Sequence, residues 1–124
     1  MSKMVESFEK ITEQLKSDMG EGFVANDFWH QKDAQSLYGF NTQPKACALF
    51  NEVTRTLDKT MQGAEFPGLG EYYVVHLEND LLVVIAIAGE YQHGMLVDLS
   101  KTTMGILMSV ALPNLLSEFK KAIS

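Results

Sequence analysis

Apolar residues recur along the first twenty positions with the period of an α-helix. The recurring side chains are Met4, Phe8, Ile11, Leu15 and Met19. Spacings of three and four residues place them on one face, and two glycines follow at once. The pattern predicts an amphipathic helix over residues 2–19.

A hairpin pattern comes next. Phe23 to His30 is rich in β-branched and aromatic residues, which indicates a strand. The polar residues 30–33 predict its turn, and Gln35 to Phe40 predicts the returning strand.

The segment after the hairpin has the signals of a second helix. In Asn41-Thr42-Gln43-Pro44, Thr42 is the expected cap and the proline suits the first turn. The helix is predicted to continue to about residue 61. We expect an apolar stripe to face the core, made of Ala46, Phe50, Val53, Leu57 and Met61. A second flank is small or moderately polar, with Cys47, Asn51, Thr54 and Asp58.

The C-terminal half predicts three strands and a helix. The strands are Tyr72 to Leu77, the almost wholly apolar Leu81 to Ala88, and Tyr91 to Leu99. Ser100 or Thr102 is expected to cap a helix over residues 103–122. Its apolar face would hold Met104, Met108, Ala111, Leu115 and Phe119. Pro113 interrupts this pattern and predicts a kink or two abutting helices.

The order of these elements predicts the fold class. Helix, two strands, helix, three strands and helix fit one α+β domain over residues 1–124. We expect a single five-stranded antiparallel sheet in an α/β sandwich. The second helix would cover one face of the sheet, and the terminal helices the other.

Composition narrows the classes of partner and compartment. The net charge of −6 is unfavourable for nucleic-acid binding. A single cysteine and no signal-peptide pattern favour a reducing, cytoplasmic location. The longest apolar run has eight residues, too short to insert across a bilayer. The 41 residues between Lys59 and Lys101 hold no Lys or Arg but six carboxylates, which form either a solvated face or a surface for a basic partner.

Candidate chemistry is weak. His30, His76 and His93 lack the spacing of a metal site, and no nucleophile elbow or phosphate loop is present. Cys47 lies between two alanines of a predicted helix, which indicates a packed thiol. We therefore expect no catalytic residue, no cofactor and no metal.

Several segments resemble the roadblock/dynein light chain superfamily. They are Tyr72-Tyr-Val-Val-His-Leu77, the strand over 81–88, Met95-Leu-Val-Asp98 and Thr103-Met-Gly-Ile-Leu107. The chain departs from the family at the first hairpin, where His30-Gln31-Lys32-Asp33 replaces an Asp-Gly turn, and at Pro113.

The resemblance implies a non-enzymatic scaffold. Roadblock-like domains pair their third strand and second helix across a two-fold axis, and they bind Ras-like small GTPases or act as subunits of motor and signalling complexes. Carried onto this chain, the expected partners are a second copy, as a homodimer, and a small GTPase. The expected interface residues are Cys47, Asn51, Thr54, Tyr72, Val74 and His76.

Two other hypotheses remain at this level. A PAS-like or profilin-like sensor would enclose a small molecule, with Trp29, Tyr38 and Phe40 as candidate lining residues. An enzyme with a site that the sequence does not reveal is the other.

Overall fold

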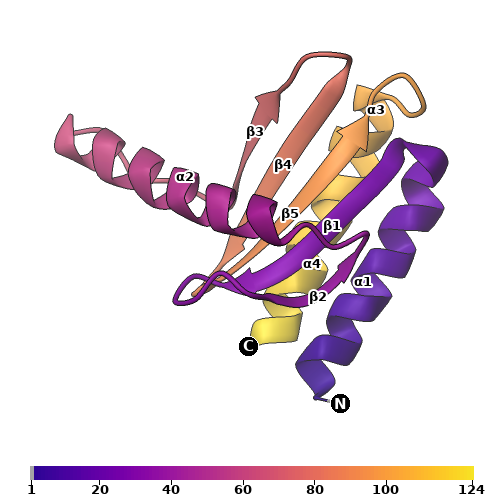
Figure 1. Cartoon of the computed structure of the whole chain (residues 1–124), viewed down its shortest axis with the longest axis horizontal. Coiled ribbons are helices and arrows are strands. Elements are labelled where there is room, and N and C mark those ends of the chain that lie inside the picture. The colour runs from indigo at the N-terminus through magenta and orange to yellow at the C-terminus, as the bar shows by residue number, and fades with distance from the viewer. Residues whose placement is uncertain (1) are drawn as a thin grey trace.

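One antiparallel sheet organises residues 2–124, which are the residues that the computed structural model describes (Figure 1). Its strands are β1 (Phe23–His30), β2 (Ser36–Phe40), β3 (Tyr72–His76), β4 (Leu81–Ala88) and β5 (Tyr91–Asp98). They lie in the order β2-β1-β5-β4-β3, and each neighbouring pair is antiparallel. The predicted five-stranded α+β fold is confirmed.

Helices cover the two faces of the sheet unequally. They are α1 (Lys3–Met19), α2 (Pro44–Gly63), α3 (Met104–Ile106) and α4 (Leu112–Ile123), with a 3-10 turn at Gly20–Gly22 and a π-helical segment at Leu107–Ala111. Helices α1 and α4 pack on one face, whereas α2 alone crosses the other. In Figure 1, α2 crosses the strands obliquely and its C-terminal half extends beyond β3.

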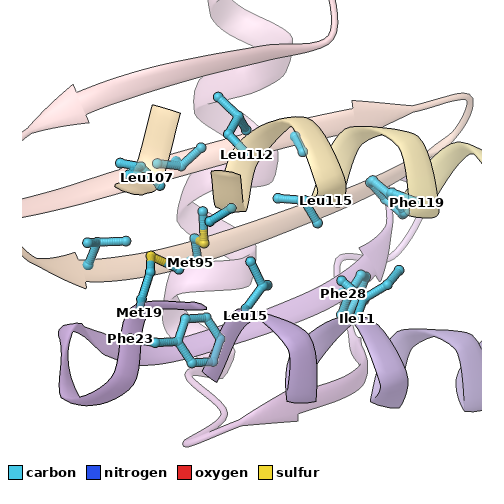
Figure 2. Packing of buried hydrophobic residues seen from close by; sticks show 14 of the residues in the cluster. Ile11, Leu15, Met19, Phe23, Phe28, Met95, Leu107, Leu112, Leu115 and Phe119 are labelled. Carbon is cyan, nitrogen blue, oxygen red and sulfur yellow. The ribbon is translucent and has the colours of Figure 1, made fainter. Parts of the chain in front are cut away.

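The larger core lies between the sheet, α1 and α4 (Figure 2). The predicted face of α1 is buried at Phe8, Ile11 and Leu15. Phe28 of β1 stacks on Phe8 with ring centroids 4.1 Å apart, and Phe119 of α4 meets Phe28 edge-on at 5.6 Å. Burying these rings together ties the two terminal helices to the sheet.

The smaller core lies under α2. It joins Cys47 to Trp29, Val83 and Ile85 of the sheet. The flank of α2 that faces the sheet is therefore the small, moderately polar one. The expectation that the apolar stripe faces the core is wrong along its outer part, where Leu57 is 36% exposed. The reason is that the polar flank makes hydrogen bonds to the sheet, which fix how α2 is rotated.

Both expected helix caps are corrected by the structure. The N-cap of α2 is Gln43 rather than Thr42, and its backbone N–H donates to Asp27 Oδ2 at 2.8 Å. A carboxylate from the sheet thus replaces a local cap. The last helical region is capped by Thr103, whose Oγ1 accepts from the Ile106 N–H at 3.1 Å.

Pro113 explains why the last helical region is divided. The π-helical segment ends immediately before α4, and Pro113 occupies the first turn of α4. A proline there requires no N–H donor, and the wider preceding turn accommodates its ring. The extra residue in that turn shifts the helical phase. Consequently Leu107 is buried, whereas the predicted core residue Met104 is 46% exposed.

Candidate functional site

Strand β3 leaves one edge of the sheet open. It is the last strand in the order and pairs only with β4. Leu77 N donates to Leu81 O at 2.7 Å, and Ile87 N donates to Glu71 O at 2.8 Å, so the odd-numbered residues of this segment bond to β4. Along an antiparallel pair, residues that hydrogen-bond to the neighbouring strand alternate with residues whose backbone groups point away from it. The backbone N–H and C=O groups of the residues between them, Tyr72, Val74 and His76, therefore point away from the sheet.

The side chains of these three predicted interface residues lie on the α4 face of the sheet. Val74 packs against the larger core, and Tyr72 and His76 are exposed. Their neighbours Tyr73 and Val75 instead belong to the α2 side. The strand residues can thus meet a second chain through their backbone edge, but their side chains do not face the same surface as α2.

The predicted helix residues hold α2 to its own sheet. Cys47 is fully buried. Asn51 Oδ1 accepts from Trp29 Nε1 at 3.1 Å and from Gln92 Nε2 at 2.9 Å. Thr54 shares a 2.8 Å hydrogen bond with the Tyr73 hydroxyl and donates to the Phe50 carbonyl at 2.7 Å, so its own partners are within this chain. These three side chains position the helix rather than project from it.

An apolar flank of α2 lies outside the set of predicted interface residues. Phe50 and Val53 are partly buried, Leu57 is 36% exposed, and Leu49 on the adjoining outer side is 56% exposed. The stripe was visible in the sequence, but the pattern alone assigned it to the core.

A groove runs between this flank and the sheet. It has a volume of about 260 Å³, and its sheet side is formed by Val83 of β4, Leu96 of β5 and Leu77, which follows β3. Ala46 and Phe50 form its helix side. We call this the apolar groove, and it adjoins the open edge through Leu77, the residue that follows β3.

The opposite flank of α2 borders a larger, polar cleft of about 700 Å³. Lys32 from the β1–β2 turn and Arg55 and Lys59 from α2 surround it, and Gln92 of β5 lines it. We call this the polar cleft. The two hollows lie on opposite sides of the same helix.

Three carboxylates of the acidic stretch have an ion-pair or hydrogen-bond partner within the chain. Glu71 forms an ion pair with Lys120 of α4, and Glu90 lies 3.2 Å from the His30 imidazole. Hydrogen bonds from Ser100 lower the pKa of the Asp98 carboxyl. These contacts use three of the six carboxylates and support the solvated-face interpretation for them.

The buried thiol is poorly suited to nucleophilic chemistry. Burial raises the pKa of Cys47 to about 12, and the neighbouring Asp27 carboxylate adds to the effect. A thiol with this pKa is protonated at neutral pH, whereas the thiolate is the nucleophile.

Among residues 2–124 the structure also groups no three His, Cys, Asp or Glu side chains around a possible metal position. None of the helices described has the length and apolar character needed to cross a membrane.

The aromatic pocket of the sensor hypothesis is not formed. Trp29 is buried on the α2 side of the sheet, whereas Tyr38 and Phe40 pack against the larger core on the other side. The sheet itself separates them.

Comparisons with known proteins agree with this architecture. No family model matches the sequence, and no curated protein matches it. Among solved structures, the gliding protein MglB from Thermus thermophilus is similar with a TM-score of 0.80 at 10% identity, over 98% of this chain and 92% of that one. An MglB described as having a tetrameric arrangement gives 0.77 at 8% identity, over 98% and 90%. A Roadblock/LC7 domain from Streptomyces avermitilis gives 0.66 at 11% identity, over 92% and 95%.

The fold is the roadblock fold. The resemblance seen in the sequence is confirmed at the level of the fold. The motifs of the C-terminal half that carried the resemblance correspond to β3, β4, β5 and the start of the last helical region.

Proposed function

We propose that this roadblock-fold chain is a non-enzymatic, homodimeric scaffold that binds a protein partner, a Ras-like small GTPase or a subunit of a motor or signalling complex. One observation carries the proposal. The sheet edge at β3 is open, and Leu77, which follows β3, lines the same groove as Phe50 on the partly exposed apolar flank of α2. Soluble proteins normally cover or block such edges. This one contains no Lys or Pro between residues 71 and 76.

A second copy fits both features at once. Two β3 strands paired across a two-fold axis would satisfy the outward-pointing N–H groups of Tyr72, Val74 and His76 and join two sheets into one. Helix α2 extends beyond β3 (Figure 1), so it would lie over the neighbouring sheet. In this arrangement the second copy's α2 would pack against the apolar groove, and Leu57 of one copy would contact Phe50 of the other across the axis.

The partner class follows from the fold family that the chain resembles. Its roadblock-like domains bind Ras-like GTPases without supplying catalytic residues. The protonated state of Cys47 is in keeping with such a non-enzymatic role.

Two measurements test the proposal. Multi-angle light scattering across a hundredfold range of concentration should give the mass of two chains. Pull-downs from the native extract, with GDP or a non-hydrolysable GTP analogue added, should recover a small GTPase identified by mass spectrometry. A monomer at every concentration would overturn the dimer. Failure to enrich any GTPase in either nucleotide state would overturn the small-GTPase partner while leaving the dimer intact.

A further inference from the structure

The polar cleft shares no lining residue with the apolar groove. It lies on the flank of α2 opposite the apolar groove, between the helix, the β1–β2 turn and the β4–β5 turn. Thr54 and Gln92 lie on its inner side, and the side chains of Ile87 and Leu69 supply apolar wall. Its volume of about 700 Å³ is within the range of small-molecule sites.

Cations gather at this cleft in a chain that is otherwise acidic. Three of the ten Lys and Arg residues line it, although the chain carries a net charge of −6. Arg55 pairs with Glu52. Within residues 2–124, neither Lys32 nor Lys59 forms an ion pair.

The carboxylates at the cleft are already engaged. Asp58 accepts from the Leu69 N–H at 2.8 Å and from the Gln62 amide at 2.8 Å. Glu90 contacts the His30 imidazole at 3.2 Å. Lys32 and Lys59, which form no ion pair among the residues described, can bind an anionic ligand, and a phosphate is an anion that lysine commonly binds.

Gln92, which lines the same cleft, carries a buried acceptor atom without a donor. Gln92 is only 3% exposed, and its Nε2 donates to Asn51 Oδ1 at 2.9 Å. Asn51 also donates to the Gln31 carbonyl at 2.9 Å, so its orientation is determined by its partners. This orientation leaves Gln92 Oε1 with no hydrogen-bond partner. Buried carbonyl oxygens normally accept a hydrogen bond, so this one points to an N–H donor that the chain does not supply.

We propose that the polar cleft binds a small organic phosphate that carries an N–H donor, of the nucleoside monophosphate class. Lys32, Lys59 and Arg55 would hold the phosphate. Gln92 Oε1 would accept from an amino or imino group of the base, and Ile87 and Leu69 would contact the face of the base. Because the apolar groove is on the other flank, the ligand and the second copy can bind together.

Isothermal titration calorimetry on the full chain tests this with a panel of probes. AMP and GMP each carry both groups, ribose 5-phosphate lacks the base, adenosine lacks the phosphate, and inorganic phosphate lacks both base and ribose. We expect saturable binding of at least one nucleotide, at least tenfold tighter than any of the three partial probes. Equal affinity for the nucleotide and ribose 5-phosphate, or no saturable binding of either nucleotide, would overturn the proposal.

Variants assign the binding to this cleft. Lys32→Ala/Lys59→Ala should weaken nucleotide binding at least tenfold, whereas Lys45→Ala, an exposed cation at the other end of α2, should not change it. Gln92→Met removes the acceptor and should reduce nucleotide affinity to that of ribose 5-phosphate. Circular dichroism checks that each variant folds, and the double lysine variant decides the outcome if Gln92→Met does not. Unchanged affinity in a folded double variant would contradict the site.

Discussion

Asn26 and His93 are hydrogen-bonded in the middle of the sheet, with Asn26 Nδ2 3.0 Å from His93 Nε2. The orientation of the Asn26 amide is determined because its Oδ1 accepts from the Phe40 backbone N–H at 2.9 Å. Its NH2 group therefore donates to the imidazole and also to Thr12 Oγ1 at 2.9 Å. His93 Nε2 is an acceptor, which places the ring proton on Nδ1. The contact requires a neutral histidine.

Acid should destabilise the chain through this histidine. Complete burial lowers the pKa of His93 from 6.5 to about 3. Above pH 6.5 neither the folded nor the unfolded state binds the proton, so the stability is fully present. As pH falls below that value, only the unfolded histidine protonates, and the free energy of unfolding should drop by about 1.4 kcal/mol per pH unit. Urea titrations at pH 7, 6, 5 and 4.5 measure this slope.

His93→Gln is the control for the pH experiment. It keeps a side chain that can hydrogen-bond Asn26 but removes the titrating ring, while every carboxylate that titrates in the same range stays. The variant should start less stable at pH 7 and lose less stability on acidification. If the free energy of unfolding fell equally with pH in the two proteins, His93 would not be the cause of the acid destabilisation.

Proline substitutions should distinguish the open edge of β3 from its paired side. The Val74 N–H points outward, so Val74→Pro should preserve the pairing with β4 and yet block a second β3 strand. Light scattering should then give the mass of one chain, with a circular dichroism spectrum like the wild type. Val75 is the matched control because its N–H points toward β4; Val75→Pro should remove a hydrogen bond of the ladder and lower the melting temperature. A folded, fully dimeric Val74→Pro would refute edge pairing.

Leu57→Asp tests the apolar flank of α2. Leu57 is 36% exposed in a single chain, so a carboxylate there should cost that chain little. Inside the proposed dimer it would be buried without a partner, and the dimer dissociation constant should rise at least a hundredfold, or about 3 kcal/mol. Thr56→Asp is the control, since Thr56 is exposed and points about 100° away around the helix. Sedimentation velocity that found equal dissociation constants for both variants would remove Leu57 from the interface.

The Cys47 thiol should be inert in the folded protein. It is fully buried and its pKa is raised to about 12, so a disulfide reagent at pH 8 should label it only when the chain opens. Labelling should be complete within the mixing time in 6 M guanidinium and slower by orders of magnitude in buffer. Cys47→Ser should retain the dimer and partner binding. Fast labelling of the native chain would indicate a reactive thiol and reopen a functional role for it.

Local patterns in the sequence determined most of the elements. The spacing from Phe8 to Met19 required a helix with one apolar side, and the unbroken apolar run of β4 required a strand covered on both faces. With the order of elements, these constraints left one sheet with helices on both faces. These signals lie within single elements, so they can be recognised without knowledge of the tertiary contacts.

The tertiary structure alone decided which flank of α2 faces the sheet. In the sequence, the stripe of Phe50 and Leu57 was the natural core face, and Cys47, Asn51 and Thr54 were assigned to a partner. The structure turns Cys47, Asn51 and Thr54 towards the sheet, because Asn51 bonds to Trp29 and Gln92, and Thr54 to Tyr73, on strands 19 to 41 residues away in the chain. Such hydrogen bonds fix the rotation of the helix about its axis. The spacing of apolar residues in the sequence does not reveal them, because their partners are far away in the chain. The same rotation exposes the apolar flank beside β3 and opens the polar cleft on the other side.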